Sequence, residues 1–200
     1  MTLDQALAFL IFALVAAVSP GPSNVMIAAA GSAVGFWRGL PCAFGAAIGM
    51  GSLLFASALG LGQIITGQPM ILMALNWCGA AFLLWLAWKI ATAGKSANTD
   101  DNPAKRVGFL EAAMFQWINP KGWLVAVSAA GTFLHAAAPN PFVPAAAFGI
   151  LFFAAAFPSG LVWLALGASM QKLMRDDRKA RILNITMGLA LAASVTMILL

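Results

Sequence analysis

The stretch QWINPKGW, residues 116–123, interrupts an apolar segment that runs from about residue 109 to 136. A segment of this length can cross a bilayer as a helix. Pro120 removes a backbone donor and clashes with the preceding turn, whereas Asn119 is a good N-cap and Pro120 suits the first helical position. The stretch therefore predicts that one helix ends and a second begins within the membrane. Lys121 then lies in the first turn of the second helix, where a charge is costly and marks a candidate functional site.

The composition is that of an integral membrane protein. Hydrophobic residues make up 62% of the 200-residue chain and charged residues only 8%, against about 25% in a soluble domain. No basic n-region precedes the first apolar segment, so we expect it to be a span and not a cleaved signal peptide. Six apolar segments are predicted to span the membrane and leave no room for a soluble domain. They cover approximately residues 3–30, 40–65, 70–92, 109–136, 144–168 and 181–200.

The positive charges predict the topology. All 11 Lys and Arg residues except Lys121 lie in or beside the first, third and fifth loops, and Arg38 belongs to the first of these. The positive-inside rule makes these loops cytoplasmic and places both termini outside, in the periplasm. Because anionic lipid headgroups explain basic residues beside spans, nucleic acid is not an expected partner.

A polar linker at residues 94–108 divides the chain into halves of three spans each, residues 1–93 and 109–200. An odd number of spans per half makes the second half enter from the opposite side, as in an inverted repeat. Shifting the chain by 100 positions aligns Pro20 with Pro120. We therefore predict an all-α membrane fold of six transmembrane helices in two inverted three-helix repeats, with helices 1 and 4 broken near the membrane midplane.

The first span contains a matching interruption, SPGPSN, at residues 19–24. Two prolines and a glycine cannot continue a regular helix, and Ser19 is expected to cap a half-helix that starts at Pro20. Pro20 and Pro120 each lie roughly 17 Å along the helix from the cytoplasmic end of the segment, near the midplane of a core about 30 Å thick. Two half-helix N-termini would then face the centre and attract anions, as broken helices do in transporters. Two purely structural kinks are the alternative.

The candidate substrate-binding residues come from both interruptions. Glu111, at the cytoplasmic edge of the fourth span, is a candidate proton relay, with pairing to Lys105 or Arg106 as the alternative. His135, at the outer end of that span, could titrate near neutral pH. The GxxxG motif at residues 45–49 predicts close helix packing. The candidate binding residues are Ser19, Pro20, Gly21, Pro22, Asn24, Asn119, Pro120 and Lys121.

The spans carry few groups for other chemistry. Cys42 and Cys78 have no CxxC spacing, so neither a zinc site nor a disulfide framework is expected. No Ser/His, HExxH or paired Asp pattern lies in the spans, and we expect no enzyme, no cofactor and no metal. A redox carrier would need cysteines at the interruptions, and a metal or cation exporter would need His, Asp or Cys ligands. Both stay as alternatives, and a passive channel is also compatible with the sequence.

Three features together define a resemblance: Pro-Gly-Pro at 20–22, Asn-Pro-Lys at 119–121, and six predicted spans in about 200 residues. The chain resembles the LysE/RhtB family of amino-acid exporters. The run GAAFLLWLAWK at 79–89 is similar to the third span of that family, and closest to its cysteine and O-acetylserine exporters. The chain departs from the pattern at Ser23, where many members have Asn, with Asn24 following.

The resemblance implies export of amino acids or small derivatives across a bacterial inner membrane, driven by the proton gradient. We expect the carboxylate of a zwitterionic substrate to lie near Lys121 and the half-helix N-termini. The ammonium group would meet helix carbonyls freed by the breaks, together with Asn24 or Asn119. The expected partners are an amino-acid-like small molecule, protons and the lipid bilayer, and a homo-oligomer is also compatible with the sequence.

Overall fold

The structure is a computed structural model that describes residues 2–62, 64, 67–92, 107–133, 140–170 and 177–199. Every regular element in these ranges is a helix, and no strand occurs among them. The predicted all-helical class is therefore confirmed for this part of the chain. The elements are α1 (Leu3–Val18), α2 (Pro22–Val34), α3 (Phe36–Ala56), the π-helical turn η1 (Ser57–Leu61), α5 (Pro69–Ala91), α6 (Phe109–Ile118), α7 (Pro120–Phe133), α8 (Phe142–Ser169) and α9 (Asp177–Leu199).

Several of these helices are long and apolar enough to cross a membrane. Within the described ranges they are α3 together with η1, α5 and α8. The pair α1 and α2 makes a fourth if it is counted as one broken span, bent by 57°. The structure thus has the membrane-spanning helices that the composition predicts. The total of six spans stays a prediction.

The first span breaks at its prolines, but its second helix begins two residues later than expected. α2 begins at Pro22, and Gly21 is its extended N-cap, with φ −179° and ψ 176°. A residue before proline is driven away from the helical conformation, so Gly21 cannot belong to the helix and Pro22 takes the first position. The prediction that Ser19 caps a helix starting at Pro20 is therefore wrong. Ser19 instead follows the last residue of α1, and its hydroxyl donates to the carbonyl of Ala16 (2.8 Å).

The break in the fourth span has the predicted cap. α6 ends at Ile118 and α7 begins at Pro120, with Asn119 between them in an extended conformation (φ −82°, ψ 110°). The side-chain oxygen of Asn119 accepts a hydrogen bond from the backbone N–H of Lys121 (3.2 Å). Asn119 as N-cap and Pro120 at the first helical position are both confirmed.

The turn between α2 and α3 is shorter than predicted. Gly35 alone joins the two helices, and its φ of +81° is in the left-handed region that favours glycine. Arg38, which we expected in a loop, therefore lies in the first turn of α3.

The GxxxG motif brings α3 and α6 into backbone contact. A β-carbon at Gly49 would lie 2.5 Å from the carbonyl oxygen of Ala113, and a β-carbon at Gly45 would overlap the carbonyl of Phe109. Only glycine allows an approach this close. The predicted packing role of the motif is confirmed.

We expect Gly45→Leu to destabilise the protein strongly because the new side chain would collide with the backbone of α6. Overpacking of roughly 3 kcal/mol should lower the midpoint of thermal unfolding by about 10 °C for a chain of this size. Thermal unfolding in detergent measures the shift. The matched control is Gly131→Leu, because a β-carbon at Gly131 meets no atom within 4 Å among the described residues. Equal midpoints for the two variants would contradict the packing.

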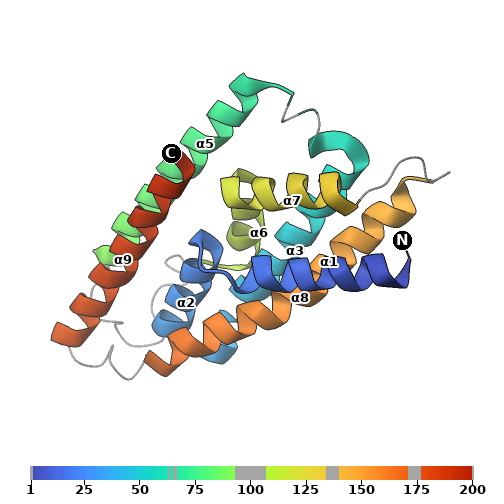
Figure 1. Ribbon diagram of the computed structural model, residues 1–200. Coiled ribbons are helices and arrows are strands. Elements are labelled where there is room, and N and C mark those ends of the chain that lie inside the picture. The colour runs from blue at the N-terminus through green and yellow to red at the C-terminus, as the bar shows by residue number, and fades with distance from the viewer. Residues whose placement is uncertain are drawn as a thin grey trace.

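The helices are arranged around α3 and α8, which pack closely on each other (Figure 1). α1 and α2 pack on α8, and α6 packs on α3. α5 and α9 lie side by side along one edge of the molecule (Figure 1). This arrangement places α3 beside both helix breaks and α8 beside the break in the first span.

Candidate functional site

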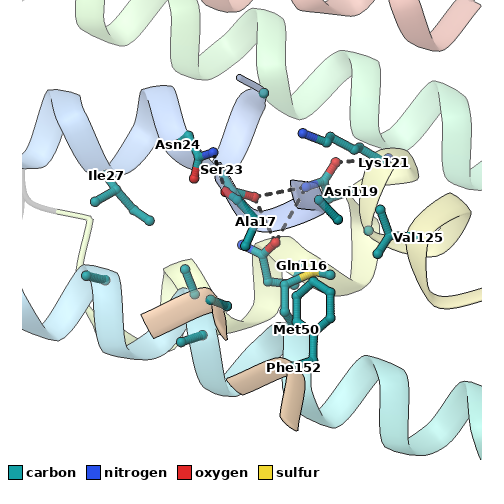
Figure 2. Close-up of a pocket in the computed structure, with 17 residues that line it drawn as sticks. Ala17, Ser23, Asn24, Ile27, Met50, Gln116, Asn119, Lys121, Val125 and Phe152 are labelled. Atoms are coloured by element: carbon teal, nitrogen blue, oxygen red, sulfur yellow. Dashed lines mark hydrogen bonds between the residues drawn. The ribbon is translucent and has the colours of Figure 1, made fainter. Parts of the chain in front are cut away.

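The structure brings the two helix breaks into direct contact. The hydroxyl of Ser23 in α2 donates to the side-chain oxygen of Gln116 in α6 (2.8 Å), and the Asn119 amide nitrogen donates to the Ser23 oxygen (3.0 Å) (Figure 2). The amide nitrogen of Gln116 donates to the carbonyl of Ala112 (3.1 Å). Side chains more than 90 residues apart in the sequence therefore form one polar network between the breaks.

Lys121 reaches from the start of α7 to the end of α1. Its ammonium group donates to the carbonyl of Ser19 (3.0 Å), the hydroxyl of Ser19 (2.8 Å) and the carbonyl of Pro20 (3.1 Å). A lysine ammonium has three donor hydrogens, and these contacts can engage all of them. The stem crosses over Gly21, where an added β-carbon would lie 2.9 Å from both Cδ and Nζ of the lysine. A side chain at position 21 would therefore displace the end of the lysine side chain.

Side chains satisfy the carbonyls that the break in the first span frees. The Asn24 amide nitrogen donates to the carbonyls of Ala17 (2.8 Å) and Ser19 (2.9 Å), and the Trp163 ring nitrogen donates to that of Val18 (3.3 Å). The sequence predicts that these carbonyls are open to a substrate ammonium, but in this conformation all three have donors. The Lys121 ammonium also binds the Ser19 carbonyl, since the C-terminal end of a helix attracts cations.

A cavity of about 60 Å³ lies between the two breaks. It is large enough for several water molecules, at about 10–15 Å³ each, or for a small solute. Its polar side chains are Ser23, Asn24, Gln116, Asn119 and Lys121, and Figure 2 shows them gathered on one side of the pocket. Small or apolar residues of α1, α2, α3, α7 and α8 complete the lining: Ala16, Ala17, Gly21, Ile27, Ala43, Ala46, Ala47, Met50, Gly122, Val125, Phe152 and Ala156.

The eight predicted binding residues fall into three groups. Ser19 and Pro20 provide the oxygen atoms that hold the Lys121 ammonium. Pro22 and Pro120 begin the second half-helices. The remaining four line the cavity itself: Gly21, Asn24, Asn119 and Lys121.

Two polar cavity residues were not among the predicted ones. Gln116 is fully buried, with 0% of its surface exposed, and it links Ser23 and Asn119. A signal was present in the sequence, because Gln116 is an uncharged polar residue in an apolar span, three positions before Asn119. Ser23 sits within the interrupted stretch of the first span, beside the predicted Asn24.

Glu111 lies away from the cavity, at the start of α6. It is exposed, and its carboxylate accepts the backbone N–H of Gly108 (2.6 Å), which suits the positive end of a helix. Its predicted partners Lys105 and Arg106, and also His135, lie outside the described residues. Cys42 is buried in α3 and Cys78 is exposed in α5, and neither is among the described residues that line the cavity.

Apolar helices with a polar cavity at two helix breaks are typical of multi-pass membrane transporters. The family model described as LysE type translocator matches residues 14–199, and the chain belongs to this family. No solved structure matches the chain.

Several curated relatives carry the name "Cysteine/O-acetylserine efflux protein". The protein from Salmonella choleraesuis is 35% identical over 128 residues, and that from Escherichia coli K12 is 31% identical over 127 residues. Each of these alignments covers 64% of this chain and 64% of the relative, so the chain spans less than two thirds of their length. The protein from Klebsiella pneumoniae is 29% identical over 167 residues, 83% of each chain.

Proposed function

We propose that the protein is a secondary transporter that exports amino acids or small amino-acid derivatives across the bacterial inner membrane, coupled to protons. The observation that carries the proposal is the cavity at the paired breaks, which is lined by Lys121 together with the amide side chains of Asn24, Gln116 and Asn119 and the hydroxyl of Ser23. A cation with neutral hydrogen-bonding groups suits a small zwitterion. The direction of transport, outward, is taken from the names of the matched relatives.

The proposed substrate lies between Lys121 and the polar network. Its carboxylate faces the Lys121 ammonium and the N-terminal ends of α2 and α7, where anions are stabilised. Asn24 and Asn119 are placed to contact its polar groups, since both line the cavity. The side chain of the substrate faces the alanines of α3, such as Ala43 and Ala47. These small residues leave room for a cysteine-sized substrate.

Filling the cavity should block export. Ala156→Leu adds a larger side chain at a cavity-lining position of α8. Substrate would then have to fit into an overpacked cavity, at a cost of roughly 1–3 kcal/mol. We therefore expect export of cysteine and O-acetylserine to fall by about tenfold or more. The assay measures efflux of labelled substrate from cells. Ala154→Leu is the matched control, because Ala154 is an exposed residue of the same helix. Undiminished export by Ala156→Leu would show that substrate does not pass this position.

The redox carrier and the cation exporter are less well supported. The cavity residues include Lys121 and neither cysteine, whereas a redox site would need thiols there. A fixed ammonium group repels a cation. Replacing both Cys42 and Cys78 with alanine should therefore leave export unchanged.

The proposed architecture has six spans, in inverted repeats of residues 1–93 and 109–200, with both termini in the periplasm. One feature supports the repeat: α6 of the fourth span packs on α3 of the second, while α1 of the first packs on α8 of the fifth. These are equivalent pairs if the two halves are related by symmetry. In this scheme Glu111 lies at the cytoplasmic edge, as a candidate proton relay.

Purified protein in proteoliposomes tests the function. Vesicles are loaded with labelled O-acetylserine, and a pH gradient is imposed across the membrane. We expect the pH gradient to accelerate efflux and a protonophore to abolish this acceleration. Efflux that is unaffected by the protonophore would indicate a passive channel, and no efflux of any amino acid would contradict the proposal.

A further inference from the structure

We propose that the carbonyl groups at the end of α1 are the binding position for the ammonium group of the substrate, and that Lys121 occupies this position as an internal stand-in until substrate arrives. The inference rests on the proposed function and adds to it a specific exchange of two ammonium groups. It assigns the Ser19 and Pro20 oxygens to recognition of a primary ammonium group.

The first observation is the chemistry of the three acceptors. The carbonyl oxygens of Ser19 and Pro20 and the hydroxyl oxygen of Ser19 lie 3.0, 3.1 and 2.8 Å from Nζ of Lys121. Three oxygens around one nitrogen match the three hydrogens of a primary ammonium group. All three are neutral and lie at the negative end of the α1 dipole, so they attract a cation without a carboxylate.

The second observation is where the occupying ammonium comes from. Lys121 belongs to the first turn of α7, 102 residues from Ser19, so the bond crosses from one helix break to the other. Its flexible four-carbon stem can withdraw without moving either helix. Lys121 also lines the cavity, and a withdrawn ammonium therefore meets a substrate held there.

This arrangement distinguishes zwitterions from single-charge solutes. An amine without a carboxylate must compete with a tethered ammonium at high effective concentration, and it offers the displaced Lys121 no anion. A solute with a carboxylate but no amine attracts the Lys121 ammonium away from its position. The Ser19 and Pro20 carbonyls then lose the hydrogen bonds from Lys121 and gain none from the solute. Only a molecule with both groups satisfies both sites at once. When the substrate leaves, Lys121 returns to the carbonyls.

The test compares cysteine with cysteamine, which differ only in the carboxylate. Binding of each under reducing conditions is measured to purified protein in lipid nanodiscs. For wild type we expect cysteine to bind at least about tenfold more tightly than cysteamine. In Lys121→Met the lysine no longer competes for these oxygens, and the Ser19 carbonyl keeps one lone pair free beside its bond from Asn24. Cysteamine should therefore bind about tenfold more tightly than to wild type and cysteine about tenfold more weakly.

Two variants serve as controls. Lys89→Met removes a lysine of α5 that lies over the ring of Trp85, outside the cavity lining, and should change neither affinity. Lys121→Arg keeps the charge and should not gain cysteamine affinity. If Lys121→Met does not fold, Lys121→Gln takes its place.

Cysteamine affinity that stays the same or falls when Lys121 is neutralised would overturn the inference. A gain in cysteamine affinity supports the inference, whatever the affinity of wild type for cysteine. Failure of wild type to bind cysteine or O-acetylserine would instead contradict the proposed function.

Discussion

Replacing Lys121 with alanine should reduce export of cysteine and O-acetylserine by at least about 100-fold, which corresponds to roughly 2.8 kcal/mol. The ammonium makes three hydrogen bonds to Ser19 and Pro20, and hydrogen bonds to charged groups contribute about 1.5–3 kcal/mol each. The substitution also removes the proposed partner of the substrate carboxylate. Efflux of labelled substrate from cells with matched amounts of membrane-inserted protein measures the effect.

Lys121→Arg separates charge from geometry. Arginine keeps the positive charge, but its planar fork cannot place three hydrogens around one nitrogen. We expect export between that of wild type and that of Lys121→Ala. A Lys121→Ala protein that inserts normally and exports at the wild-type rate would exclude a role for the lysine.

The second large effect is expected at Gln116. Gln116→Leu removes the side-chain oxygen that accepts hydrogen bonds from the Ser23 hydroxyl and the Asn119 amide nitrogen. Both donors then lose this partner. Each such buried group costs about 1–3 kcal/mol, so export should fall by about 10- to 100-fold. Gln68→Leu is the matched control, because Gln68 is exposed at the start of α5.

A double-variant cycle tests whether this network joins the two breaks. Ser23→Ala should reduce export in the wild-type background and have a smaller further effect in Gln116→Leu, where the Ser23–Gln116 hydrogen bond is already lost and only the bond from Asn119 to Ser23 remains. Strictly additive effects of the two substitutions would contradict the link.

The backbone breaks were predictable because they follow from strong local rules. Closely spaced prolines and glycines, and a proline preceded by an asparagine cap, favour a break followed by a new helix, and so Pro22, Asn119 and Pro120 lie at helix starts in the structure. A single proline is not enough, because Pro41 and Pro158 lie inside α3 and α8. The sequence predicts Pro20 as the first helical residue, whereas α2 begins two residues later, at Pro22. The effect of Pro22 on Gly21 decides this position.

The contacts within the site were harder to predict because they are long-range. Nothing local in the sequence indicates that Ser23 meets Gln116 or that Lys121 reaches the carbonyl of Ser19. The small cavity-lining residues of α3, such as Ala47, have no chemical signal of their own. They are recognised only once α3 is seen beside both breaks.

Substrate protection of a cavity cysteine tests the central claim most directly. Ala47→Cys is introduced into a chain in which Cys42 and Cys78 are replaced by alanine, and its reaction with methyl methanethiosulfonate is timed. Ser169→Cys, at the exposed end of α8, is the control position. O-acetylserine is the ligand because it has no thiol to consume the reagent. If the cavity binds substrate, O-acetylserine should slow the reaction at position 47 by about fivefold or more, as at a largely occupied site, and leave position 169 unchanged. An unchanged rate at position 47 in a protein that still exports O-acetylserine would place the substrate elsewhere.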